Sequence, residues 1–138
     1  MEEIILREYG TYREDEVLDL YRSVGWSAYY DHPDTLRKAF EKSLWILAAW
    51  KGSRLVGLLR VVGDGETVVF LQDILVHPSC QRQGIGRRLV AGMLQRYAHV
   101  RQLHLHTDDV PSTTEFYKAV GFTPLEEIHG KAFTRLRY

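Results

Sequence analysis

The chain has 138 residues, enough for one domain with a real core, and its 45% apolar and 26% charged residues are an ordinary balance for a folded protein. Lysine plus arginine equals aspartate plus glutamate at 18 each, so the formal net charge is zero and a broad basic face for nucleic acid is not expected. Cys80 is the only cysteine, which excludes an internal disulfide, and no apolar stretch approaches the roughly 20 residues that span a bilayer. We therefore expect a soluble, cytoplasmic protein with a single domain over residues 1–138 and no nucleic-acid or membrane partner.

The first forty residues predict one strand followed by two helices. Val17, Leu20 and Val24 recur at helical spacing, and Gly25 is suited to end that helix as a C-terminal cap. Pro33 is suited to the first turn of the second helix. The expected elements are a strand at 2–7 and helices at 14–24 and 33–43, with a loop between the helices.

Three apolar runs then predict an antiparallel meander. Gly63-Asp64-Gly65 supplies the residues with positive φ that a hairpin turn favours. The predicted strands cover 44–50, 55–63 and 67–76.

After Gly84 the apolar period changes to that of a helix. The strand–helix–strand unit over 67–107 should form a parallel crossover. Apolar residues around His129-Gly130 indicate a closing pair of strands. The elements expected here are a helix from 84 to 98, a strand at 101–107, a helix at 112–120, and strands at 122–126 and 131–137.

The segment QRQGIG, residues 81–86, has the properties of an anion-binding turn. A glycine-rich turn before a helix leaves several backbone N–H groups unpaired at the positive end of the helix dipole. The P-loop pattern fails because no Lys-Ser/Thr pair follows Gly86 at the required spacing. The dinucleotide fingerprint fails because Leu89 stands where its third glycine belongs.

QRQGIG, preceded by a strand that ends VHP (76–78), resembles the acetyl-CoA-binding core of the GNAT acetyltransferases. The segment STTEFYKAVGF (112–122) resembles the second signature of that family, a helix that carries Phe-Tyr and ends in Gly-Phe. The resemblance covers nearly the whole chain. It implies an α/β fold with a mixed, mostly antiparallel sheet of six to seven strands, about four flanking helices, and a splay between the strands at 67–76 and 101–107.

The resemblance implies acetyl-CoA as co-substrate. His104 and His106 share one face of a predicted strand, but no third ligand accompanies them, so no metal is expected. The turn would hold the CoA pyrophosphate, and the end of the preceding strand would offer backbone groups to the pantetheine arm. A backbone N–H near Leu75 would stabilise the oxyanion of the tetrahedral intermediate. The implied cofactor-binding residues are Ile74, Leu75, Val76, Arg82, Gln83, Gly84, Ile85, Gly86 and Arg87.

Tyr117 stands where the family commonly keeps a tyrosine that protonates the leaving thiolate, although a role in core packing is an alternative. Some relatives place a glutamate base on the strand before the turn, where this chain has Gln72 and Asp73. Asp73 is the candidate base, and strand alternation places it on the opposite face from Gln72. The alternatives are a structural role, in which Asp73 binds backbone N–H groups, and proton removal by water.

Trp26, Tyr29 and Tyr30 lie in the segment where the family usually selects its acceptor. Their rings are candidates for a cleft wall that binds substrate, and the alternative is that they cover the core. The function implied is acetyl transfer from acetyl-CoA to a primary amine of a small molecule or peptide, by direct attack in a ternary complex. A non-catalytic CoA-binding sensor or partner-binding module is the second hypothesis. Relatives also make a homodimer conceivable.

Overall fold

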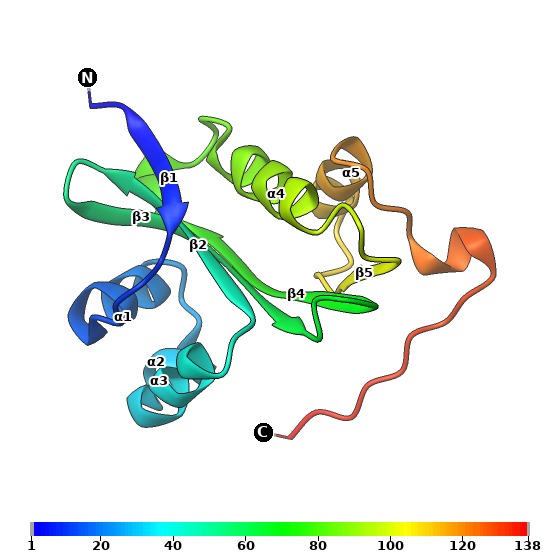
Figure 1. Ribbon diagram of the computed structural model, residues 1–138, viewed down its shortest axis with the longest axis horizontal. Helices are drawn as coiled ribbons and strands as arrows, with labels where there is room; N and C mark the ends of the chain where they lie inside the picture. The colour runs from blue at the N-terminus through cyan, green and yellow to red at the C-terminus, as the bar shows by residue number, and fades with distance from the viewer. Residues whose placement is uncertain (1, 138) are drawn as a thin grey trace. The chain divides into compact units, whose positions relative to one another are not determined.

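The computed structural model describes residues 2–137. The chain divides into two compact units, one extending to His106 and the other starting at Thr107. The first unit contains a sheet with helices on both faces, and the second contains a helix and an extended C-terminal segment (Figure 1).

The sheet has five strands in the order β1-β2-β3-β4-β5. Neighbours from β1 to β4 are antiparallel, and β5 is parallel to β4, as the predicted meander and crossover require. The Asp64 carboxylate stabilises the β3–β4 turn because it accepts the N–H groups of Glu66, Thr67 and Val68. The strands are β1 (Ile4–Glu8), β2 (Trp45–Lys51), β3 (Arg54–Gly63), β4 (Val68–Val76) and β5 (Gln102–Leu105).

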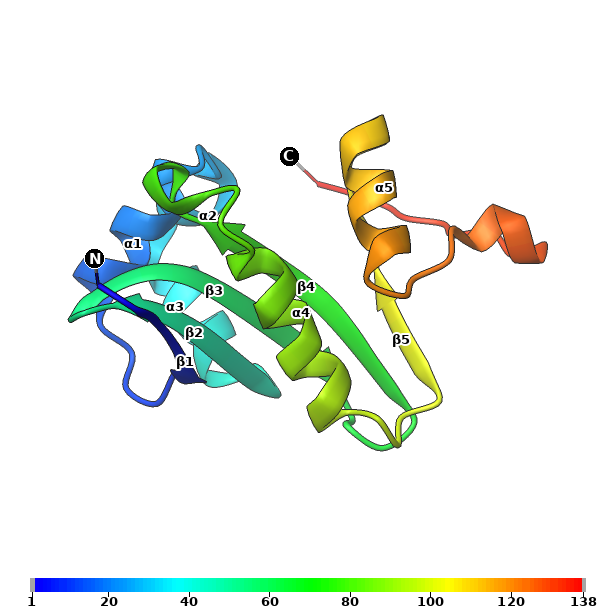
Figure 2. The same ribbon diagram turned by 90° about the horizontal axis from the view of Figure 1, so that it is seen from above.

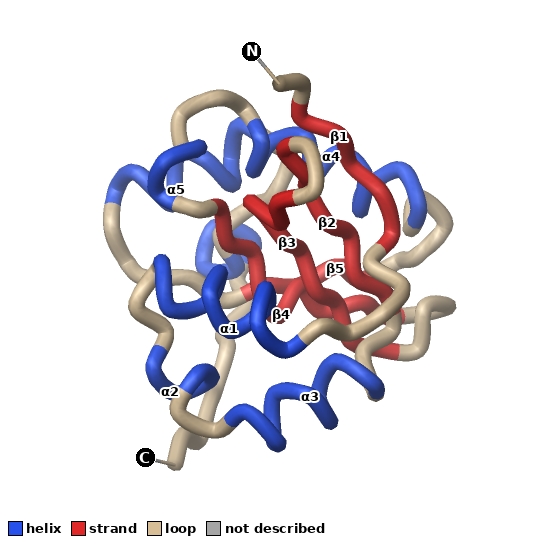
Figure 3. Tube along the Cα trace, turned by 90° about the vertical axis from the view of Figure 1, so that its left-hand side faces the viewer, coloured by secondary structure: helices blue, strands red, loops and turns tan. Residues whose placement is uncertain are grey.

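Helices cover the two faces of this sheet unequally. α1 (Glu14–Ser23), α2 (Ser27–Tyr30) and α3 (Pro33–Glu41) lie on one face, and α4 (Ile85–Arg96) lies on the other (Figures 2 and 3). The helices predicted at 14–24, 33–43 and 84–98 are confirmed within a few residues. The expected loop between α1 and α3 instead contains the short helix α2.

Apolar side chains fill the space on both faces. On the α1 side, Tyr21, Leu36 and Leu58 are almost fully buried in one cluster. On the other side, α4 lies so close to the sheet that a Cβ on Gly92 would come within 2.7 Å of Leu47 on β2. No helix among residues 2–137 is both long and apolar enough to cross a membrane.

The second unit does not form the predicted closing pair of strands. It contains α5 (Pro111–Ala119) and a short 3₁₀ helix at Leu125–Ile128, and residues 131–137 have no regular structure. Phe133 is 85% exposed and Leu136 is 64% exposed, so these apolar side chains cover no core. The prediction of six to seven strands was therefore too high, because an apolar pattern makes a strand only where another strand edge pairs with it.

Candidate active site

β4 and β5 separate halfway along β4. The parallel ladder joins Val68–Leu71 to Gln102–Leu105, whereas the ladder with β3 continues as far as Val76. In the described part of the chain, residues 72–76 therefore have no strand partner on the β5 side. This is the predicted splay.

The backbone of β4 faces this open edge at alternate residues. His77 donates its N–H to Val56 O on β3 at 2.8 Å. Antiparallel pairs alternate between hydrogen-bonded and non-bonded, so Leu75 turns its backbone groups toward β3, whereas Ile74 and Val76 turn theirs outward. Of the three residues predicted to offer backbone groups to a ligand, only Ile74 and Val76 therefore direct theirs at the open edge.

One acceptor on the open edge is already used within the chain. The side-chain amide of Gln81 donates to the carbonyl oxygen of Val76 at 3.0 Å. This contact joins the glycine turn to the end of β4.

The turn before α4 has the backbone geometry of an anion-binding site. Gly84 has φ +79° and Arg82 has φ +63°, so the chain bends sharply just before Ile85 begins the helix. No side chain caps the helix, and Arg88 N–H bonds to Gly84 O. The preceding N–H groups therefore point out of the end of the helix, where they can bind an anion together.

The charges around the turn favour an anion. The first turn of α4 contains no acidic residue. Arg82 and Arg87 are exposed, whereas Arg88 points away and donates to Ile4 O on β1 at 3.1 Å. The side chain of Ile85 is buried, so this residue offers a ligand only its backbone.

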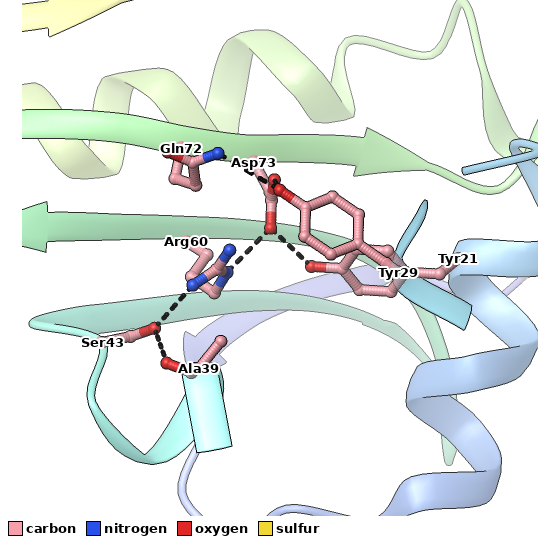
Figure 4. Close-up of polar contacts among 7 residues, drawn as sticks. All are labelled: Tyr21, Tyr29, Ala39, Ser43, Arg60, Gln72 and Asp73. Carbon is pink, nitrogen blue, oxygen red and sulfur yellow. Dashed lines mark hydrogen bonds and ion pairs between the residues drawn. The ribbon is translucent and has the colours of Figure 1, made fainter. Parts of the chain in front are cut away.

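On the α1 side of the sheet, Asp73 forms a buried ion pair with Arg60 (Figure 4). The exposed fractions are 2% for Asp73 and 4% for Arg60, and Arg60 Nε donates to Asp73 Oδ2 at 2.7 Å. Tyr21 donates to the same oxygen at 2.9 Å, and Tyr29 donates to Oδ1 at 2.8 Å. Burial, followed by the nearby Asp73 charge, raises the pKa of Tyr21 well above its usual value. Asp73 is thus bonded by side chains, not by the backbone N–H groups expected of a structural role.

A β-bulge corrects the prediction that Gln72 and Asp73 face opposite sides. Arg60 pairs with Asp73 and Val61 pairs with Leu71, which leaves Gln72 as the extra residue. Gln72 Nε2 lies 3.2 Å from the hydroxyl oxygen that Tyr29 directs at Asp73. Both neighbouring side chains therefore reach the same tyrosine, and Gln72 remains exposed.

The three aromatic residues between α1 and α3 pack on the core to different extents. Tyr29 and Tyr30 are half-buried against the core cluster. Trp26 is 36% exposed and meets Tyr21 edge-on at a centroid distance of 6.0 Å. The packing alternative therefore holds for the two tyrosines, and Trp26 presents part of its ring to solvent.

In the second unit, the end of α5 fixes Tyr117. Gly121, at φ +106°, donates to Lys118 O, and Phe122 donates to Tyr117 O. This pair of hydrogen bonds is a Schellman motif, and it brings the Phe122 ring edge-on to Tyr117 at 6.1 Å. The Phe116 ring also meets the Tyr117 ring edge-on, at a centroid distance of 5.1 Å. Burial raises the pKa of Tyr117 above its usual value.

Sequence reasoning missed Arg60 and Tyr21 as partners of Asp73. A signal existed, because Arg60 and Asp73 each interrupt an apolar run in adjacent predicted strands. Buried charges are found paired, so these two residues were candidates for an ion pair. The part played by Tyr21 had no comparable signal.

The sequence and fold of the chain are similar to those of known proteins. It belongs to the acetyltransferase (GNAT) family, whose sequence pattern matches residues 5–122. A solved GNAT family acetyltransferase from Streptococcus pneumoniae TIGR4 is 34% identical, with a TM-score of 0.88 over 98% of both chains.

Two further comparisons involve named activities. Chloroplastic serotonin N-acetyltransferase 2 of Oryza sativa subsp. japonica is 35% identical over 113 residues, which are 75% of this chain. The match spans 54% of that protein, so the chain corresponds to about half of it. An aminoglycoside N-acetyltransferase solved with CoA shares the fold at a TM-score of 0.73, with 18% identity, over 100% of this chain and 96% of the other.

Proposed function

We propose that this protein transfers an acetyl group from acetyl-CoA to a primary amine of a small molecule or peptide. The observation that carries the proposal is the open edge of β4, which leads directly into the uncapped N-terminus of α4. An extended, amide-bearing ligand arm fits such an edge, and its phosphates fit the turn that follows. The family membership and the solved relative with CoA support the same donor.

The donor would be held mainly by the backbone. The turn from Arg82 to Arg87, which includes Gln83, Gly84, Ile85 and Gly86, would bind the pyrophosphate through N–H groups and the two exposed arginines. Ile74 and Val76 would pair with the pantetheine arm. The Val76 carbonyl already accepts from the Gln81 amide, and its second lone pair would be the one that pairs with the arm. An outward N–H at Ile74 would stabilise the oxyanion.

The acceptor ammonium must lose one proton before attack and its nitrogen must lose a second one afterwards, whereas the departing sulfur must gain one. The neutral amine attacks the thioester carbonyl carbon, the new C–N bond forms, the nitrogen gives up its second proton, and collapse of the tetrahedral intermediate breaks the C–S bond. Tyr117 would give its proton to the departing thiolate sulfur. A tyrosine with its ordinary pKa of about 10 is already protonated at neutral pH, and burial raises the pKa of Tyr117 further, so the phenol carries a proton to donate.

Asp73 is reassigned from general base to positioning residue. It is buried, paired with Arg60 and bonded to two tyrosines, so an amine from solvent does not reach it. Water would then take both protons that leave the acceptor nitrogen, one before the attack and one after it.

A CoA-binding sensor remains the second candidate function, because no side chain is assigned as the base that acetyl transfer needs. Calorimetric titration with acetyl-CoA tests the donor site that both functions share. Gly86→Glu should abolish binding, since a carboxylate in the first turn of α4 would occupy and repel the anion site without disfavouring the helix. Ala91→Glu is the matched control, because it adds the same charge to an exposed position of the same helix.

Binding in the parent and in Ala91→Glu, with loss in Gly86→Glu, would support the donor site. Absence of binding in the parent would overturn it. CoA release is then measured with serotonin, tryptamine, spermidine, an aminoglycoside and a short peptide. The rice relative's name puts serotonin first. Binding without acceleration for any of these amines would select the sensor.

A further inference from the structure

The polar network at the β4 bulge has a fixed direction of hydrogen bonding. Asp73, in its ion pair with Arg60, offers only acceptor oxygens. Tyr29 lies 2.8 Å from Asp73 Oδ1 and must donate its single proton there. Burial and the Asp73 charge raise the pKa of Tyr29, which keeps that proton in place.

This direction sets the orientation of the Gln72 amide. Because the Tyr29 proton is committed to Asp73, the Tyr29 oxygen can only accept from its other neighbour. The Gln72 atom 3.2 Å away must therefore be the NH₂ group. The other polar atom of this amide, the carbonyl oxygen Oε1, therefore has no hydrogen bond to Tyr29, and the Gln72 side chain is exposed.

Gln72 occupies a distinctive position along β4. It is the extra residue of the bulge, and it directly follows Leu71, the last residue paired with β5. It is also two residues before Ile74, the first outward-facing backbone position after the bulge. Gln72 therefore stands at the start of the open edge, to which the acyl end of the donor is proposed to bind.

We infer that Gln72 Oε1 accepts a hydrogen bond from the N–H of the attacking amine, and that Tyr29 and Asp73 hold this oxygen in position. The inference rests on the proposed acetyl transfer. This contact makes Gln72 a specificity-determining residue for primary amines. A neutral primary amine has two N–H groups, so one can keep the hydrogen bond to Gln72 while the other loses its proton during the reaction. A neutral carbonyl also avoids stabilising the ammonium form, as a carboxylate at this position would.

The experiment is a double-mutant cycle on the best amine of the panel above. Gln72→Met keeps the length of an exposed side chain and removes its amide, and it should raise KM about tenfold with kcat changed less than about threefold. Tyr29→Phe frees the amide to rotate, and it should raise KM by about threefold. If Tyr29 acts through Gln72, the double variant should match Gln72→Met alone.

Gln95→Met is the matched control, because Gln95 is exposed on α4. It should change neither constant. All variants should keep the parent's affinity for acetyl-CoA, and circular dichroism checks that Tyr29→Phe is folded.

Unchanged KM in Gln72→Met, or additive effects in the double variant, would overturn the inference while leaving the proposed function intact. A parent that binds acetyl-CoA but acetylates no amine would overturn both. The two failures are therefore distinguishable.

Discussion

The ends of α1 and α5 have the same local structure around a tyrosine. In each, a glycine with positive φ donates to the carbonyl three residues earlier, and the next residue donates to the carbonyl of the tyrosine. An aromatic ring then packs edge-on to that tyrosine. The two sets are Tyr21, Gly25 and Trp26 in α1, and Tyr117, Gly121 and Phe122 in α5.

The surroundings of the two tyrosines differ. The hydroxyl of Tyr21 is buried and donates to Asp73 beside Arg60, so its proton is committed to a structural contact. Tyr117 is half-buried, and burial is what raises its pKa. The same helix ending can therefore serve a structural tyrosine and a candidate acid, and the partners of the hydroxyl decide between these roles.

The largest expected effect comes from removing the partner that distinguishes Tyr21. Asp73→Ala should lower the free energy of unfolding by about 3–5 kcal/mol, because it leaves Arg60 buried without a counter-charge. Urea unfolding measures this loss. Asp31→Ala, at an exposed position, should stay within about 0.5 kcal/mol of the parent. A loss below about 1 kcal/mol for Asp73→Ala would contradict the structural role of the pair.

The next effect separates the two tyrosines by activity. Tyr117→Phe should lower kcat about 100-fold, the usual contribution of a general acid, with unchanged affinity for acetyl-CoA. Tyr21→Phe should leave kcat within a few-fold and cost about 1–2 kcal/mol of stability, because Asp73 loses one buried hydrogen bond. Steady-state kinetics and urea unfolding of both variants make the comparison. Unchanged turnover in Tyr117→Phe would sink the assignment of the acid.

The smallest effect is a loss of stability at high pH. The pKa of Tyr21 is raised by folding, so the stabilisation is fully present below the unfolded tyrosine pKa of about 10 and is lost as the pH rises through the folded pKa. Between pH 9 and 11, stability should therefore fall. The slope above pH 10 should be less steep in Tyr21→Phe, by up to about 1.4 kcal/mol per pH unit. Tyr117→Phe should reduce it less, since Tyr117 is more exposed, and equal reductions would contradict the difference in burial.

Local signals explain what the sequence predicted well. Gly25 and Gly121 mark helix ends because few other residues adopt their positive φ, and Pro33 marks a helix start. The glycine turn before α4 is local in the same sense. The splay was implied by family resemblance and not by any local pattern.

Long-range pairing explains what the sequence did not predict. The bulge at Gln72 exists only in the register between β3 and β4, so strict alternation misplaced Asp73. The apolar residues at 131–137 suggested a strand, but these residues pair with no strand in the described structure. Both errors concern partners that lie far away in the sequence.

The open edge of β4 also bears on solubility. Unpaired strand edges are templates on which foreign chains add and aggregate. Here the bulge at Gln72 interrupts the regular ladder, and the Gln81 amide covers the Val76 carbonyl at its far end. The free edge is thereby kept short and irregular. The protein can keep part of β4 unpaired while offering little to a second strand.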